Sequence, residues 1–142
     1  MNKQVCTFTV GDTLFGVDVP SIQEVLRLQP MTRVPLAPTV VAGLINLRGQ
    51  ILTAIDLRER LGLSRAPEDI SRMNLVVRLP VETVSFLVDD VGEVLNLTDD
   101  QFEEVPSTLR AAVKEVTSGV YKLKDGLLLL LNITAAATLP AK

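Results

Sequence analysis

The sequence predicts an all-β fold in which two small β-barrels pack together. Its apolar side chains are mainly Val, Ile and Leu, only 4% of its residues are aromatic, and none is Trp; β-branched aliphatic residues favour strands. Short segments of alternating apolar residues stand between turn residues, as expected for strands joined by tight turns. The second half of the chain also repeats the pattern of the first, and a unit of roughly 70 residues with about five short strands has the size of a small barrel.

The internal repeat can be followed position by position. Residues 43–57 align without a gap with residues 119–133. Each segment holds a glycine, an apolar strand, a polar tip, a second apolar strand and an Asp or Asn that can cap a helix. Residues 22–28 align in the same way with residues 91–97. The two halves therefore look like copies of one unit.

This repeat sets the expected domain organisation. We expect a single domain over residues 1–142, with a first barrel over approximately 1–68 and a second over approximately 69–142. Closing each sheet into a barrel would also remove its exposed edges. The repeat leaves open whether the two barrels exchange strands.

The first elements can be predicted from spacing. Residues 5–10 and 14–19 alternate on either side of a Gly-Asp-Thr turn and predict a β-hairpin. Ser21 and Glu24 have the spacing of a capping box, which predicts a short helix over residues 22–27. Three prolines then stop regular structure in the connection that follows: Pro30, Pro35 and Pro38.

A central hairpin occupies residues 40–57, where two apolar runs flank Asn-Leu-Arg-Gly. Asn at the first and Gly at the fourth position favour a type I turn, which would place Leu47 and Arg48 at the tip of the hairpin. Arg48 is the only formal charge between Arg33 and Asp56. Asp56 can cap a short helix that ends before a glycine.

The second half contains further strand signals. Strands are expected over residues 73–79, 83–88, 91–97, 116–123 and 127–131. The last two flank an Asp-Gly pair, a strong hairpin signal. A helix-like patch at residues 109–113 lies within the acidic and least regular region, residues 98–115, and Asn132 can cap an alanine-rich helix over residues 133–139. The polar residues 64–72 are interpreted as a linker.

Composition excludes several classes of function. The net charge is −3, the pI is about 4.9 and the basic residues are scattered, which argues against nucleic acid or an anionic membrane surface as a partner. The single cysteine, Cys6, excludes an internal disulfide and fits a reducing compartment. No signal-peptide pattern is present, and the longest apolar run, residues 127–131, is too short to span a membrane. We expect a soluble cytoplasmic protein.

Catalytic chemistry has little support in the sequence. The chain contains no histidine, so Ser-His and Cys-His nucleophile pairs are impossible. Cys6 lies on the apolar face of a strand and is expected to be a buried, unreactive thiol, and no glycine-rich phosphate loop is present. The acidic pairs Asp89-Asp90 and Asp99-Asp100 are interpreted as solvated turn residues. A metal-dependent hydrolase that uses these turns is the alternative from another class of function.

Arg48 and Glu24 each allow two interpretations. Glu24 either completes the capping box with Ser21, or points at a partner or pairs with Arg48. Arg48 is either a solvated hairpin tip or an interface anchor, a role for which Arg is favoured. The second copy of the hairpin has Lys124-Asp125 at this position. Because the repeat did not keep Arg-Gly, the fold does not require it, and we favour a binding site specific to the first copy.

An ordered set of motifs over residues 3–139 resembles the CheW domain. The segments are FTVG at 8–11, FGVDV at 15–19, IQEV at 22–25, VPLAP at 34–38, GLINLRG at 43–49, IDLRERLG at 55–62, VDDV at 88–91 and GV at 119–120. Each is weak alone, but their combination is highly specific. Thr53-Ala54 departs from the family, which usually has a Val-Pro or Pro-Val pair there. The absence of a receiver or kinase module favours a stand-alone adaptor.

The resemblance implies two SH3-like, five-stranded β-barrels and a scaffold without catalytic residues, cofactor or metal. CheW-like proteins join the cytoplasmic tip of a chemoreceptor to the regulatory domain of the histidine kinase CheA, at the membrane-associated receptor array. A receptor helical hairpin would dock in the groove between the barrels. The residues that match receptor-coupling positions are Ile22, Glu24, Arg48 and Val88.

The resemblance also implies a contact with the kinase through an apolar surface of the first barrel. This surface is expected near Val40, Val41 and Leu44. A CheW-like adaptor of a pathway for pilus or gliding motility, with the same fold and another receptor, is the alternative within the family.

Overall fold

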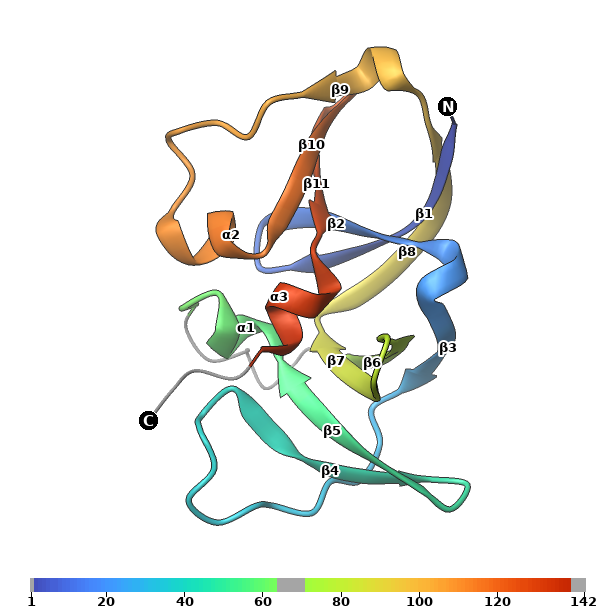
Figure 1. Ribbon diagram of the computed structural model, residues 1–142, viewed down its shortest axis with the longest axis vertical. Helices are drawn as coiled ribbons and strands as arrows, with labels where there is room; N and C mark the ends of the chain where they lie inside the picture. Colours follow the sequence, from blue (N-terminus) through green and yellow to red (C-terminus); the bar gives the residue numbers. More distant parts are fainter. Residues whose placement is uncertain (1, 64–70, 139–142) are drawn as a thin grey trace.

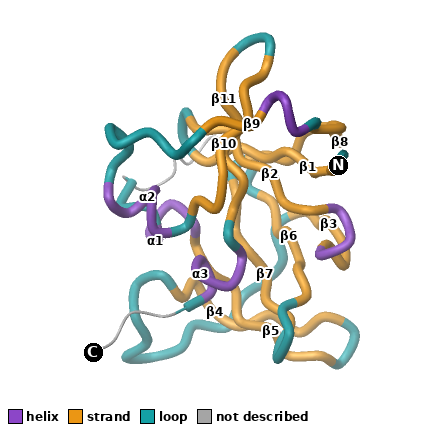
Figure 2. Tube along the Cα trace, turned by 45° about the horizontal axis from the view of Figure 1, so that its top comes forward, coloured by secondary structure: helices purple, strands orange, loops and turns teal. Residues whose placement is uncertain are grey.

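The computed structural model describes residues 2–63 and 71–138. Figure 1 shows two curled sheets stacked one above the other. The upper sheet has six strands in the order β8-β1-β2-β11-β10-β9, and the lower sheet has five in the order β3-β6-β7-β5-β4. The helices are short; they lie in connections between strands, except for the one at residues 133–137, which follows the last strand (Figure 2). The predicted all-β class with two small barrels is therefore confirmed.

The strands have the following bounds. The six-stranded sheet contains β1 (Lys3–Val10), β2 (Thr13–Asp18), β8 (Asp90–Leu97), β9 (Phe102–Glu103), β10 (Thr117–Leu123) and β11 (Gly126–Leu131). The five-stranded sheet contains β3 (Ile22–Arg27), β4 (Val41–Leu47), β5 (Gln50–Asp56), β6 (Met73–Arg78) and β7 (Thr83–Val88).

The division of the chain into sheets differs from the expected boundary near residue 68. The five-stranded sheet is one continuous segment, residues 22–88, whereas the six-stranded sheet combines residues 3–18 with residues 90–131. The N-terminal hairpin β1–β2 occupies in one sheet the place that β6–β7 occupies in the other. In each sheet the second strand of that hairpin pairs in parallel with the second strand of a repeated hairpin, β2 with β11 and β7 with β5.

The repeat extends to the register of the hairpins. Gly43 pairs with Ala54 and Gly119 with Leu130, and the register shifts just before each glycine. The sixth strand, β9, pairs with β10, and at the equivalent place in the other sheet Thr32 makes an isolated bridge with Leu44. Five strands were expected in each sheet. The upper sheet has a sixth because its segment beside β10 forms a short strand, whereas the equivalent segment beside β4 makes only a single bridge.

Alternation along the strands divides the apolar side chains among three cores. One face of β5 places Ile55 in the largest core, which lies between the two sheets, while the other face places Leu52 inside its own barrel. In β1, Phe8 enters the shared core and Val5 the interior of the six-stranded barrel. Phe8 and Phe15 stack in the shared core with ring centroids 5.6 Å apart. Because each such side chain contributes about 1.5–3 kcal/mol on burial, the shared core joins the barrels firmly.

The helices are α1 (Leu57–Arg60), α2 (Ala111–Glu115) and α3 (Ile133–Ala137), with 3₁₀ turns η1 (Val19–Ser21) and η2 (Asp99–Gln101). As predicted, Asp56 caps α1 by accepting hydrogen bonds from Arg58 and Glu59 N–H, and Asn132 caps α3 by accepting one from Ala135 N–H at 3.0 Å. Most of the predicted linker, residues 64–72, lies outside the described residues. Among the residues described, no helix is long and apolar enough to cross a membrane.

The helix predicted over residues 22–27 is wrong, because this segment is strand β3. It pairs antiparallel with β6, from Ile22 opposite Val77 to Arg27 opposite Met73. A six-residue helix is marginal by itself, so long-range strand pairing outweighs the local signal. Ser21 ends a 3₁₀ turn and forms no capping box.

Candidate functional site: the Glu24–Arg48 seam

The tip of the central hairpin is a two-residue turn. Arg48 and Gly49 have φ values of 52° and 89°, and the flanking Leu47 and Gln50 pair with each other. Positive φ at both positions defines a type I′ turn, whose twist matches that of the strands. The predicted type I turn is therefore wrong, and Leu47 is a buried strand residue rather than a tip residue. Asn46 Oδ1 accepts a hydrogen bond from Gly49 N–H at 2.9 Å.

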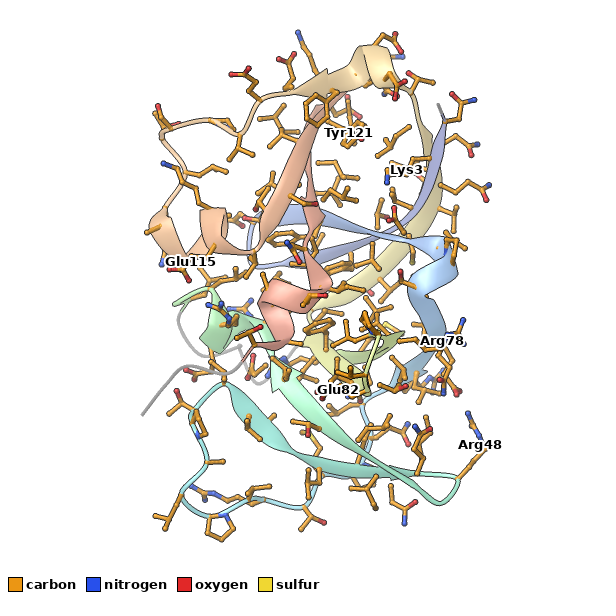
Figure 3. The ribbon with its side chains drawn as sticks, in the orientation of Figure 1. Lys3, Arg48, Arg78, Glu82, Glu115 and Tyr121 are labelled. Atoms are coloured by element: carbon orange, nitrogen blue, oxygen red, sulfur yellow. The ribbon has the colours of Figure 1, made fainter. Side chains whose placement is uncertain are left out.

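Arg48 adopts a backbone conformation that L-residues avoid. The left-handed region costs a residue other than glycine about 1 kcal/mol, and Asn or Gly normally occupies this position of a type I′ turn. The local backbone therefore does not explain why Arg is present. Its side chain is 66% exposed and extends from the tip of the hairpin (Figure 3).

Arg48 pairs with Glu24 across a seam of the barrel. Strands β3 and β4 are the two end strands of the five-stranded sheet, and the Arg48 Nη2–Glu24 Oε2 ion pair joins β3 to the β4–β5 turn. Of the alternatives left open for Glu24, the structure thus shows the pairing with Arg48. Exposed ion pairs contribute about 0–1 kcal/mol, no more than the backbone conformation of Arg48 costs. Stability thus does not account for the pair.

The second copy of the hairpin lacks this pair. Its turn residues are Lys124 and Asp125, between the paired Leu123 and Gly126, and Glu93 on β8 corresponds to Glu24. Within residues 2–63 and 71–138, Lys124 and Glu93 form no ion pair. A barrel of this kind therefore closes without such a bridge, and the Glu24–Arg48 pair is specific to the five-stranded barrel.

The other two residues of the predicted receptor site lie in different surroundings. Ile22 is half-buried at the start of β3 and packs against the shared core. Val88 ends β7 and is fully buried at 0% exposure, so the structure does not bring it to the surface beside Arg48. Ile51, two residues beyond the turn, is 61% exposed and was not among the predicted site residues. In the sequence, the only sign that Ile51 could be exposed to solvent was its position next to the hairpin turn.

The predicted kinase-contact residues lie at the end strand β4. Val41 and Leu44 are half-buried, and Leu44 bridges Thr32 through hydrogen bonds of 2.8 Å in both directions. Val40 is only 7% exposed, and its carbonyl accepts a hydrogen bond from Asp56 N–H at 2.8 Å. Val41 and Leu44 can thus take part in a surface, whereas the side chain of Val40 is almost fully covered.

The interpretation of Asp89 as a solvated turn residue is wrong. It lies between β7 and β8, where the chain passes from one sheet to the other, and its side chain is 11% exposed. Arg58 on α1 donates two hydrogen bonds to its carboxylate, at 2.8 and 2.6 Å, and Gly11 N–H donates a third at 2.7 Å. Burial disfavours the charged form, but these hydrogen bonds outweigh it and hold the pKa of Asp89 below its ordinary value.

The other candidate reactive groups show no catalytic geometry. Asp90 is exposed and its carboxylate accepts a hydrogen bond from Val91 N–H at 3.0 Å. Asp99 and Asp100 lie in η2, where Thr98 and Gln101 form the capping box. Over the part of the chain that the structure describes, no three Asp, Glu, Cys or His side chains are grouped as metal ligands. Cys6 is buried, and burial raises the pKa of its thiol, which makes it less reactive.

Comparisons with known proteins agree with this geometry. Residues 4–139 match the CheW-like domain family. The chain is 28% identical to the probable chemotaxis protein CheW of Rhizobium etli, over 94% of this chain and 86% of that protein. It is 30% identical to the chemotaxis protein CheW of Helicobacter pylori, over 92% and 78%. It is also 31% identical to Protein PilI of Pseudomonas aeruginosa, over 80% and 64%.

A solved structure has the same fold. The crystal structure of the scaffolding protein TtCheW from Thermoanaerobacter tengcongensis superimposes with a TM-score of 0.82, at 26% sequence identity and over 92% of this chain and 89% of that one. The family match covers nearly the whole chain, and it agrees with the two barrels and their repeated hairpins. The chain belongs to the CheW-like domain family.

Proposed function

We propose that this protein is a non-enzymatic cytoplasmic scaffold that couples chemoreceptors to the histidine kinase CheA, and that it reaches the membrane-associated receptor array through these partners. Membership of the CheW-like family supports the scaffold role. The observation that carries the proposal is Arg48: an exposed cation at φ 52°, paired with Glu24 across a seam. Neither the backbone nor the stability of the fold explains that residue, whereas a binding partner does.

The proposed receptor contact is formed by Ile22, Glu24, Arg48 and the exposed Ile51. Glu24 holds one guanidinium nitrogen of Arg48, which orients the side chain before a partner arrives. Because a guanidinium has five N–H donors, the remaining donors can bind carboxylates or the carbonyls at a helix end. Arg beside an apolar side chain is a common composition of binding hot spots. Val88 is left out of this contact because it is buried.

The proposed kinase contact uses Val41 and Leu44 along β4, with the almost buried Val40 just before that strand. Strand β4 ends its sheet and, apart from the bridge at Thr32, has one edge without a paired strand among the described residues. An end strand with half-buried apolar side chains can pack against a similar strand of another domain. The two proposed contacts therefore lie on one barrel but on different parts of it.

Reconstitution with a chemoreceptor and CheA tests both the scaffold role and the site. The wild-type protein should raise kinase activity only when receptor is present, and Arg48→Glu should remove that increase because it places two carboxylates side by side. Lys114→Glu reverses an exposed charge on α2 and should behave as the wild type. The double variant Glu24→Arg with Arg48→Glu should restore an ion pair between the two positions. It should not restore receptor-dependent kinase activation, because the cation then projects from β3 instead of from the hairpin turn.

The outcomes separate the function from its site. Unchanged activation by Arg48→Glu would show that the site is wrong although the protein is a coupler. No activation by the wild type with any receptor would show that the function itself is wrong.

A second candidate function is supported by the match to Protein PilI. In this hypothesis the chain is a CheW-like adaptor of another pathway, such as pilus or gliding motility, with the same fold and a different receptor. Pull-down with this protein as bait against purified receptor tips of each pathway distinguishes the two, because retention should be confined to one set of receptors.

A further inference from the structure

The six-stranded barrel has an open cleft at the place where the five-stranded barrel is bridged. The cleft lies between residues 92–95 of β8 and residues 123–127 of the β10–β11 hairpin and has a volume of about 810 Å³. Glu93 and Lys124 line it; they are the counterparts of Glu24 and Arg48. In the five-stranded barrel the corresponding side chains meet across the seam, whereas here they border a hollow.

The floor of the cleft is apolar. Leu14, Leu95 and Leu123 line it and are only partly buried, and Leu127 at its rim is 45% exposed. Apolar side chains that remain accessible inside a concave surface favour occupation by apolar groups of a ligand. The volume falls within the range of about 300–1,000 Å³ that is usual for ligand sites.

The rim of the cleft is acidic. Asp12, Glu93 and Asp125 contribute three carboxylates against the single ammonium of Lys124, a formal charge of −2. Such a rim attracts a cationic ligand and disfavours an acidic one. The cleft therefore differs in charge from the tip of the other barrel, where Arg48 is the exposed group.

Backbone groups at the cleft are suited to an extended ligand. Strand β8 ends the six-stranded sheet, and β9 covers β10 only at Val120 and Tyr121. Part of β8 and the end of β10 therefore face the cleft without a paired strand among the described residues. Gly92 is exposed, and beside it the Thr7 hydroxyl, which also lines the cleft, donates a hydrogen bond to the Glu93 carbonyl at 2.7 Å. Unpaired strand edges of this kind bind extended segments by main-chain hydrogen bonds.

We propose that this cleft binds an extended segment of a protein partner in which apolar side chains alternate with Lys or Arg. The apolar side chains enter between Leu14, Leu95 and Leu127, the cations face Glu93 and Asp125, and the backbone lies along β8. This site goes beyond the proposed receptor and kinase contacts, which lie on the five-stranded barrel. Charged residues on an end strand can also serve only to prevent self-association. If this were the only role of Glu93, no peptide would bind in the cleft.

Fluorescence anisotropy with synthetic peptides tests the proposal on the full chain. A labelled peptide that alternates Val with Lys should bind, and peptides that alternate Val with Glu or Ser with Lys should bind at least about tenfold more weakly. Binding should also weaken as salt is raised towards about 0.15 M, because the rim charges are partly screened. Equal binding of the three peptides, or none, would overturn the proposal.

Variants locate the binding. Glu93→Lys and Leu127→Ser should each weaken binding about tenfold, whereas Glu104→Lys, an exposed acid away from the cleft, should not. Amide chemical shifts should move at residues 92–95 and 123–127; shifts confined to the β4–β5 hairpin would overturn the assignment. If Leu127→Ser fails to fold, Glu93→Gln still tests binding in the cleft, because it removes one negative charge from the rim without adding a larger side chain. The peptide-binding experiment needs neither receptor nor kinase, and the Arg48→Glu variant should bind the peptide as the wild type does. Failure of this proposal can therefore be distinguished from failure of the proposed function.

Discussion

Arg58 on α1 and Asp89 at the β7–β8 crossover form a two-point ion pair at the junction of the two barrels, with both side chains almost buried at 12% and 11% exposure. Gly11, in the β1–β2 turn, donates to the same carboxylate. Three segments far apart in the sequence are thus held by one side chain. Asp56 and Arg72 form a second pair of similar burial nearby, at 2.6 Å.

The first prediction concerns removal of the Asp89 charge. Asp89→Asn removes the negative charge that accepts two hydrogen bonds from Arg58 in an almost buried position. It should lower the free energy of unfolding by about 2 kcal/mol, the scale of hydrogen bonds to a charged group. For a chain of this size that corresponds to a fall in Tm of roughly 6 °C. Thermal melts followed by circular dichroism measure it, with the exposed Glu104→Gln as the matched control. A Tm equal to that of the control would show that the pair does not hold the barrels together.

The second prediction is the pH dependence of that contribution. The pKa of Asp89 is lower in the fold than in the unfolded chain, where it is about 3.9. The stabilisation is therefore fully present above the unfolded pKa and is lost as the pH falls through the folded pKa. The difference in unfolding free energy between the wild type and Asp89→Asn should shrink as the pH is lowered from about 5 to below the folded pKa. A difference that stays constant over this range contradicts the assignment.

The third prediction separates the backbone role of Arg48 from its role in binding. Arg48→Asn loses the ion pair with Glu24 but suits a left-handed turn position, so the unfolding free energy should change by less than about 1 kcal/mol. Receptor-dependent kinase activation should nevertheless be lost, as with Arg48→Glu. A large loss of stability would instead indicate that Arg48 is a structural residue.

The fourth prediction uses the twin glycines of the repeat. A Cβ on Gly43 would lie 2.8 Å from the Thr32 carbonyl oxygen, and one on Gly119 would lie 3.0 Å from a ring carbon of Phe102. Both glycines let a passing segment approach their strand, but the half-exposed Phe102 ring can shift more easily than backbone. Gly43→Ala should therefore cost about 2 kcal/mol of stability and Gly119→Ala less. Chemical denaturation measures both, and equal effects would contradict the distinction.

Much of the fold followed from local patterns. The segments expected to be strands correspond to nearly every strand, and the alignment of residues 43–57 with 119–133 predicted two equivalent hairpins. The structure shows that their registers match. The caps at Asp56 and Asn132 also followed, because a capping side chain acts on backbone within three residues. The same alignment places Lys124 at the position of Arg48, which indicates that the fold does not require an arginine at the hairpin tip.

Other features depended on contacts that no local pattern contains. Residues 22–27 have helical spacing but form a strand because β6 offers them partners about fifty residues away. Asp89 has the local appearance of a solvated turn residue, yet Arg58 and Gly11 enclose it. The order of strands, with residues 3–18 completing the barrel of residues 90–131, is likewise set by long-range packing.

The sequence by itself determined the class of fold, its internal repeat, its family and the position of Arg48 at a hairpin tip. Spacing and chain reversal are local properties, so they can be recognised without coordinates. Only the tertiary structure decided that Arg48 meets Glu24, that Val88 is buried, and that the twin seam is an open acidic cleft. These three features depend on which strands become neighbours. The pairing of strands is determined by burial of the shared core, to which residues from both halves of the chain contribute.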